Sequence, residues 1–179
     1  LKAKSLYLGN DQSLLYWEDH RLGVLADLTY GQKIYSGWES IVEPNGIKLS
    51  DNAYQIGAKA EIVNYQGDVF LGFKQAYGDP ALYYQPLNNN LEMFDTSIGF
   101  PVFESFTAQN SFELKLNDDG MLFFVFSDTR NFIDNDIYIQ KYNNFNPVFI
   151  EPMLVVDNYF IDDNIKGIAT TSDGGCFIA

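Results

Sequence analysis

Hydrophobic and polar positions repeat along this chain at a regular interval. A segment that alternates apolar and polar residues, a short polar turn and a very apolar segment ending in an aromatic residue occur in this order three times. Alternation with a period of two is typical of a β-strand with one buried face. The terminal aromatic residues, Trp17, Phe73 and Phe126, are 56 and 53 residues apart. The pattern predicts a β-repeat of about 54 residues, and a further copy begins at residues 167–179.

The turns between the paired segments also recur. Each contains residues that accept a positive φ or bond their own backbone, and such residues between two strand-like segments predict β-hairpins. The turn pairs are Asn10-Asp11, Gln66-Gly67, Asp119-Gly120 and Asp173-Gly174. The segment after each turn is apolar on both faces, so we expect it in the middle of a covered sheet.

Each repeat continues with two more predicted strands. A polar loop follows the aromatic residue, a third strand comes next, and a connection rich in Pro, Asn and Gly leads to a fourth strand. The third strands are predicted over residues 26–30, 81–85 and 136–142, and the fourth strands over residues 46–51, 100–105 and 153–158.

Tandem copies of four antiparallel strands are typical of the blades of a β-propeller. Because one such sheet cannot bury both of its faces alone, neighbouring copies must stack. We therefore predict an all-β fold, a β-propeller segment of about three and a half four-stranded antiparallel blades. Since propellers usually close with more blades, we expect an excerpt of a longer protein, with completion by other chains as the alternative. The predicted blades are residues 1–51, 52–105 and 106–158, followed by the first half of a fourth blade at 159–179.

Composition narrows the classes of function. The 179 residues include 24 acidic and 11 basic ones, for a net charge of −13, which disfavours nucleic acid as a partner. No apolar run is long enough for a membrane-spanning helix. Cys176 is the single cysteine, so an intrachain disulfide is excluded.

Three stretches of the chain carry a resemblance to a known family. SDGGCFIA at 172–179, FVFSDTRN at 124–131 and DIYIQKYN at 136–143 resemble repeats in large propeller proteins with kelch/WD-like blades that Bacteroidota secrete. The resemblance implies export, often through type IX secretion, and an extracellular or outer membrane-associated location. The first repeat keeps Trp17 but lacks the DIY-x-Q element, and the second lacks the Asp-x-Arg pair.

Two Asp-x-Arg pairs recur in equivalent loops, Asp19 with Arg21 and Asp128 with Arg130. Because active sites are rarely repeated, we interpret both as structural ion pairs that anchor the repeat together with the terminal aromatic residues. Oxygen-rich stretches at 128–136 and 157–164 offer ligands for Ca²⁺, with ordinary turn residues as the alternative. The candidate ligands are Asp128, Asp134, Asp136, Asp162 and Asp163. No other cofactor is expected.

Aromatic residues near the predicted loops, which we expect to be exposed, are candidates for stacking on sugar rings. An aromatic face beside Asn and Asp suits a sugar ring, whereas cross-strand packing is the alternative. The candidates are Tyr77, Tyr83, Tyr84, Tyr138 and Tyr159.

These observations favour a binding module at the cell surface that recognises proteins or glycans within a larger secreted propeller protein. One alternative is an accessory or cargo subunit of an outer-membrane export or surface complex. Another is a propeller enzyme that acts on polysaccharide. Such an enzyme needs two opposed carboxylates, and the sequence identifies no catalytic residue among its 24 acidic ones.

Overall fold

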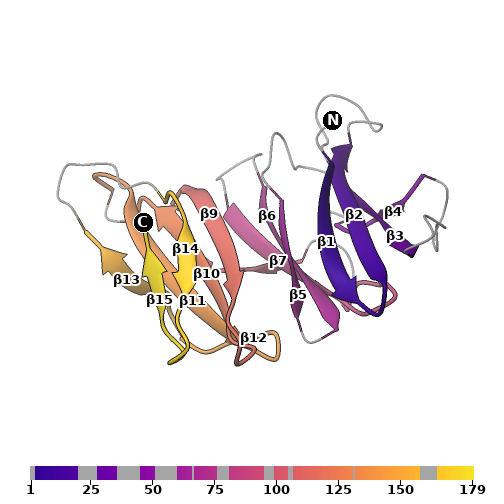
Figure 1. The fold of residues 1–179 in the computed structure, drawn as a ribbon. Helices are drawn as coiled ribbons and strands as arrows, with labels where there is room; N and C mark the ends of the chain where they lie inside the picture. Colours follow the sequence, from indigo (N-terminus) through magenta and orange to yellow (C-terminus); the bar gives the residue numbers. More distant parts are fainter. Residues whose placement is uncertain are drawn as a thin grey trace. The chain divides into compact units, whose positions relative to one another are not determined.

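A computed structural model gives the structure of this chain. Within the described residues the regular structure is entirely β, and no helix there could cross a membrane. Figure 1 shows the strands in chain order. The structure describes residues 3–19, 28–35, 45–50, 60–65, 67–75, 81–94, 99–104, 107–130, 132–157 and 165–179.

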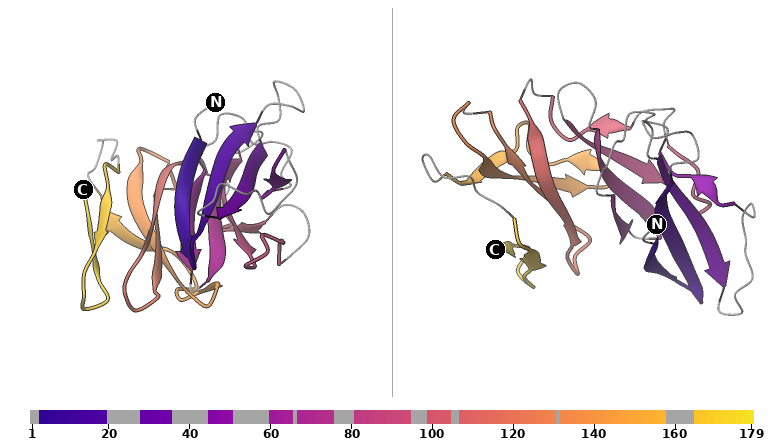
Figure 2. Two further views of the ribbon diagram at one scale, coloured as in Figure 1. Left: turned by 45° about the vertical axis from the view of Figure 1, so that its right-hand side comes forward. Right: turned by 90° about the horizontal axis from the view of Figure 1, so that it is seen from above.

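The first two sheets each contain four antiparallel strands in chain order, as predicted for a propeller blade (Figure 2). The first sheet consists of β1 (Ala3–Gly9), β2 (Gln12–Asp19), β3 (Leu28–Tyr35) and β4 (Ile47–Lys48). The second consists of β5 (Glu61–Tyr65), β6 (Asp68–Gln75), β7 (Ala81–Leu87) and β8 (Phe100–Pro101).

The third sheet has the same order with one added short strand, and a two-stranded sheet follows it. In the third sheet both β12 and β13 pair with β11. Its strands are β9 (Gln109–Leu116), β10 (Leu122–Asp128), β11 (Asp136–Asn143), β12 (Asn146–Pro147) and β13 (Met153–Val156). The last sheet is the hairpin of β14 (Ile168–Thr170) and β15 (Cys176–Ile178). Each sheet lies within one of the predicted repeat ranges.

The recurring aromatic residues occupy equivalent places near the end of the second strand of each of the first three sheets. Trp17 lies opposite Tyr30 of β3, and Phe126 lies opposite Tyr138 of β11. The ring of Phe73 stacks on that of Tyr83 in β7, with 5.9 Å between their centres. The predicted all-β repeat is therefore confirmed.

The predicted turns have the backbone conformation that their residues suggest. Asn10 and Asp11 both have positive φ, 51° and 58°, as expected for a two-residue hairpin whose twist matches its strands. Gly67, Gly120 and Gly174 also have positive φ. Positive φ at these positions is the physical reason that Gly, Asn and Asp recur there.

The third strand of the first repeat differs from its prediction. It continues to residue 35 rather than ending at residue 30, and residues 26 and 27 lie outside the described residues. Asp19 lies opposite Leu28, as Asp128 lies opposite Asp136. Tyr30-Gly31-Gln32-Lys33 therefore occupies the place of Tyr138-Ile139-Gln140-Lys141, so the first repeat retains the Tyr-x-Gln-Lys element. The prediction failed because the residues that open the strand have diverged and because Gly31 interrupts the apolar alternation.

In each of the first two sheets a glycine precedes the fourth strand and lies close to the anchor aromatic residue of that sheet, Trp17 or Phe73. Gly46 and Gly99 have φ of 72° and 75°. A Cβ atom on Gly46 would lie 2.5 Å from the Trp17 ring, and one on Gly99 would lie 2.8 Å from the carbonyl oxygen of Tyr84. Both the backbone conformation and the close approach therefore require glycine.

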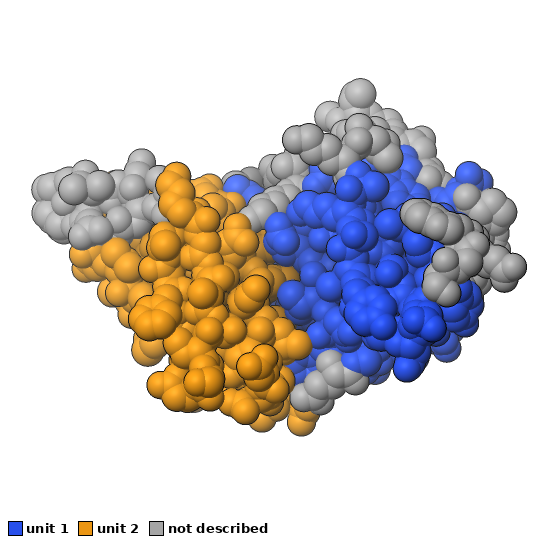
Figure 3. All heavy atoms as spheres, in the orientation of Figure 1, with its two compact units in different colours: residues 1–77, 83–100 blue, residues 78–82, 101–179 orange. Residues whose placement is uncertain are grey.

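The chain forms two compact units, residues 1–77 with 83–100 and residues 78–82 with 101–179 (Figure 3). In the first unit the first two sheets share one core, in which Leu14 and Tyr16 pack with Val69 and Leu71. The Lys4 ammonium donates to the carbonyl oxygen of Ala60 at 3.0 Å and joins the same two sheets. In the second unit the third sheet and the β14–β15 hairpin share a core of Phe123, Val125, Ile137 and Ile139 with Ile168, Cys176 and Ile178.

Candidate functional site

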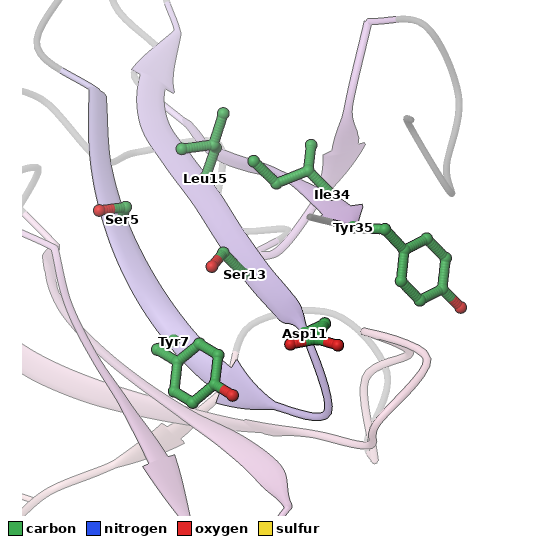
Figure 4. Close-up of a pocket in the computed structure, with 7 residues that line it drawn as sticks. All are labelled: Ser5, Tyr7, Asp11, Ser13, Leu15, Ile34 and Tyr35. Atoms are coloured by element: carbon green, nitrogen blue, oxygen red, sulfur yellow. The ribbon is translucent and has the colours of Figure 1, made fainter. Parts of the chain in front are cut away.

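A pocket of about 380 Å³ lies on the outer face of the first sheet (Figure 4). This face is opposite to the one that carries Leu14 and Tyr16 into the core, because neighbouring residues of a strand point to opposite faces. The pocket is lined by Ser5, Tyr7, Asp11, Ser13, Leu15, Ile34 and Tyr35.

Two exposed tyrosines flank this pocket. Tyr7 of β1 is 64% exposed, and Tyr35 at the end of β3 is 43% exposed. Figure 4 shows Ser13 and Leu15 of β2 between them and Asp11 in the hairpin turn below. The arrangement places aromatic surface on β1 and β3, the Ser5 and Ser13 hydroxyl groups on β1 and β2, and a carboxylate at one end.

Serine replaces a buried aliphatic residue at one place on this face. Ser5 lies opposite Leu15 in the pairing of β1 with β2. The corresponding pair in the second sheet is Ile62 with Leu71, and both side chains are buried there. The first sheet thus carries a hydroxyl group where its neighbour in sequence packs a hydrocarbon side chain.

The same replacement occurs on the adjacent strand. Ser13 lies opposite Tyr7, as Val69 lies opposite Asn64 in the second sheet. In the third sheet the equivalent residue is Leu122, and Val69 and Leu122 are both fully buried. Two serines at positions that otherwise hold aliphatic residues suit this face to a polar ligand better than to a second apolar sheet.

Two of the tyrosines predicted to stack on sugars do not have the expected exposure. Tyr84 and Tyr138 are 7% and 6% exposed, so the expectation of exposed rings is wrong for both. The Tyr84 ring is stacked against Phe70 and Phe100, with 5.0 Å and 5.3 Å between ring centres. Burial also raises the pKa of the Tyr84 hydroxyl above its usual value.

The other three predicted tyrosines do not form a site within the described residues. Tyr83 is half-buried, and its ring packs on Phe73 and against the core of the first unit. Tyr77 and Tyr159 lie outside the described residues. A role of these residues in ligand binding stays a prediction.

Tyr138 belongs to a closed network in the second unit. The Arg130 guanidinium lies 3.7 Å from the centre of the Tyr138 ring and 4.4 Å from that of Phe103. Nη2 of Arg130 donates to Oδ2 of Asp128 at 2.8 Å, and the Thr107 hydroxyl donates to Oδ1 at 2.6 Å. Burial raises the pKa of Tyr138, and the nearby Arg130 charge opposes this shift. The network stabilises the loop after β10 and keeps the Tyr138 ring and the Asp128 carboxylate buried.

In the first repeat, Asp19 takes the place of Asp128, and one hydrogen-bond donor that the structure describes for it is a tryptophan. Nε1 of Trp17 donates to Oδ2 of Asp19 at 3.1 Å. Arg21, which we expected to pair with Asp19, lies outside the described residues.

The predicted calcium ligands are split between described and undescribed parts of the chain. Asp128, Asp134 and Asp136 are buried, and Asp128 is engaged by its arginine and threonine neighbours. Asp162 and Asp163 lie outside the described residues. Among the described residues, no group of three or more His, Cys, Asp or Glu side chains could hold a metal ion. Calcium binding therefore stays a prediction.

Sequence analysis missed the pocket on the first sheet. Its signal was nonetheless present in the repeat, because aligning the copies places Ser5 and Ser13 beside aliphatic residues. An alignment of this kind depends on the strand register, which the structure supplies.

Comparison with known proteins identifies the fold of the chain. No protein-family model matches it, and no curated protein does either. One similar solved structure is an endo-arabinase from Bacteroides thetaiotaomicron, with a TM-score of 0.52 and 16% identity over 98% of this chain and 68% of that one. Another is a thermostable family-43 glycoside hydrolase, with a TM-score of 0.54 and 12% identity over 98% of this chain and 63% of that one.

Both similar structures have propeller-type folds. This chain is a β-propeller segment. The segment spans about two thirds of the length of each of the two proteins. At such low identity the likeness concerns the fold, so function has to be argued from this chain's own residues.

Proposed function

We propose that this propeller segment binds a neutral glycan on the outer face of its first sheet. The observation that carries the proposal is that Ser5 and Ser13 line a pocket flanked by two exposed tyrosines, at positions where the second sheet buries Ile62 and Val69. The similar structures add support, because the names endo-arabinase and glycoside hydrolase both refer to glycan chemistry.

The lining residues match the chemistry of a sugar ring. The rings of Tyr7 and Tyr35 offer apolar faces to the C–H side of a sugar, and their hydroxyl groups remain in water. Ser5 and Ser13 each offer a donor and an acceptor to sugar hydroxyl groups. The Asp11 carboxylate accepts hydrogen bonds from further hydroxyl groups and disfavours acidic sugars, as does the net charge of −13.

Binding is favoured over hydrolysis. Glycoside hydrolases generally place two carboxylic acid groups on either side of the bond that is cleaved. Asp11 is the one carboxylate among the described residues that line the pocket. The described residues of the pocket therefore form a recognition surface without the second acid that catalysis needs.

The proposed module works outside the cell, as part of a larger secreted propeller protein. Such a location fits a receptor for extracellular glycans, and the type IX export implied by the resemblance is part of this proposal. Recognition of a protein partner, or a place in an outer-membrane complex, is the competing function.

Isothermal titration with a panel of neutral oligosaccharides, linear arabino-oligosaccharides included, tests the proposal. We expect one class of glycan to bind, and Tyr7→Ala and Tyr35→Ala each to weaken it about tenfold, the effect of about 1.4 kcal/mol. Phe132→Ala is the matched control, because Phe132 is 84% exposed and lies outside the pocket. Absence of any glycan binding, or binding that tolerates both tyrosine changes, would contradict the proposal. Release of reducing sugar that is abolished by Asp11→Asn would show an enzyme instead.

A further inference from the structure

A lysine of the first sheet and an asparagine that follows a strand of the second are in contact within the first unit. Nζ of Lys33, on β3, donates to the main-chain carbonyl oxygen of Asn89 and to Oδ1 of its side chain, the latter at 3.0 Å. Asn89 lies in the turn after β7, 56 residues further along the chain. One pair of side chains thus connects two neighbouring sheets.

The surroundings of Lys33 are unusual for a lysine. The residue is only 6% exposed, and a lysine is rarely buried unless an opposite charge lies beside it. Within the described part of the chain, the acceptors of its hydrogen bonds are the two neutral oxygen atoms of Asn89. Burial lowers the pKa of the Lys33 amine below its usual value. The fold therefore favours the uncharged amine, which is the form of lysine that acts as a nucleophile.

The turn that carries Asn89 is fixed by its own hydrogen bonds. Oδ1 of Asn88 accepts from the N–H groups of Asn90 and Glu92, at 2.8 Å and 3.0 Å. Nδ2 of Asn88 donates to Oε2 of Glu92 at 2.7 Å. The side chain of Leu91 is buried in the core of the first unit. Asn89 is thus held in one place beside the amine.

The amine and the side-chain amide are close enough to react. A carbonyl bond is about 1.23 Å long, so the 3.0 Å hydrogen bond places Nζ of Lys33 no more than about 4.2 Å from Cγ of Asn89. Reacting atoms need to approach to about 3–3.5 Å, which requires only a small rotation of the lysine side chain. Two groups that are held in this way react as if at very high concentration.

We propose that Lys33 and Asn89 join in an amide bond that links the first two sheets covalently. The Lys33 nitrogen attacks Cγ of Asn89, the Cγ–Nδ2 bond breaks, and Nδ2 leaves as ammonia with a proton from the attacking nitrogen. No atom is oxidised or reduced, and no further reagent is consumed.

The bond would remove two costs of the unlinked structure. The product is uncharged, so the buried lysine no longer needs an opposite charge. Residues 33–89 become a closed loop, which restricts the unfolded chain as a disulfide does and so favours the folded state.

The mass of the purified 179-residue chain tests the proposal directly. We expect the intact mass to be lower than that of the sequence by one ammonia molecule. Trypsin should then leave the chain uncut after Lys33, and tandem mass spectrometry should find the peptides of Lys33 and Asn89 joined. In a denaturing gel the linked chain should migrate faster than an unlinked one, because the closed loop makes it more compact.

Matched variants show which residues form the bond. Lys33→Arg keeps a hydrogen-bond donor but cannot form the amide, and Asn89→Ala removes the carbonyl carbon that is attacked. Both should have the full mass of their sequences and migrate more slowly. Asn90→Ala is the control, since it changes the neighbouring exposed asparagine and should still lose ammonia. The mass of the unchanged protein decides the question even where a variant folds poorly.

Two results would overturn the proposal. The first is an intact mass equal to that of the sequence in protein that has been kept folded for days. The second is loss of ammonia with normal tryptic cleavage after Lys33, which would identify a cyclic imide formed by an asparagine alone.

Discussion

The guanidinium group of Arg130 lies over the ring of Tyr138, 3.7 Å from its centre. The same arginine pairs with the buried carboxylate of Asp128, so it joins the end of β10 to β11. This relationship explains why an Asp-x-Arg pair and a Tyr-x-Gln-Lys element occur together in the third repeat. The arginine needs both the acid and the aromatic face.

Removing the charge of this arginine should destabilise the protein. Arg130→Met leaves the carboxylate of Asp128, which is 0% exposed, without its cation, and such a loss typically costs about 3–5 kcal/mol. Arg130→Lys should cost less, because the charge remains while the planar contacts are lost. Urea denaturation followed by circular dichroism measures both, with Lys115→Met as a surface control. Equal stability of Arg130→Met and the unchanged protein would contradict the role of the ion pair.

Gly99, which lies close to the anchor residue Phe73, should not tolerate a side chain. Gly99→Ala has to accept a left-handed backbone and also places Cβ 2.8 Å from the carbonyl oxygen of Tyr84. Gly67→Ala is a matched control, since its φ is 99° but a Cβ there meets nothing within 4 Å. The backbone effect should cost about 1 kcal/mol in both variants. The clash should add about 1–3 kcal/mol in Gly99→Ala alone, and equal melting temperatures for the two variants would count against it.

A substitution of Ser13 should change the affinity for glycan without changing the free energy of unfolding. Ser13→Val introduces the residue that the second sheet carries at the equivalent position, Val69. Because Ser13 lies on the outer face, the free energy of unfolding should change by no more than about 0.5 kcal/mol. Glycan affinity should fall about tenfold, through the loss of a hydroxyl group from the pocket. Undiminished affinity in a calorimetric titration would remove Ser13 from the site.

Stability should decline in alkaline solution because of Tyr16. Burial, followed by the nearby Glu61 charge, raises the pKa of Tyr16 from 10.0 to about 12. The unfolded chain therefore loses its proton first as the pH increases. The stability contributed by neutral Tyr16 is complete below pH 10 and is lost as the pH rises toward 12.

The size of this decline is on the order of 2 kcal/mol, from the shift in pKa. Urea denaturation at pH 9 and at pH 11.5, compared between the unchanged protein and Tyr16→Phe, measures it. Tyr16→Phe should show the smaller decline, because the buried hydroxyl group is gone. Parallel pH dependence of the two proteins would show that other groups cause the effect.

Gln140 belongs to the Tyr-x-Gln-Lys element, which is visible in the sequence of the third repeat, but only the fold shows what its side chain does. The side chain of Gln140 donates to the carbonyl oxygen of Phe149 at 3.0 Å and accepts from its N–H at 3.2 Å. It thereby holds the segment between β12 and β13 against β11. Gln32 has the equivalent place in the first repeat, although sequence analysis did not recognise the element there.

Sequence alone determined the repeat, the type of secondary structure and the hairpin turns. These features are local, because apolar alternation and residues that accept a positive φ act within a few positions of one another. Tertiary structure decided which face of each strand is covered. Tyr84 and Tyr7 are both strand tyrosines, yet Tyr84 is stacked between two rings and Tyr7 is 64% exposed beside two serines. Burial depends on what packs against a face, and that partner comes from residues far away in the chain.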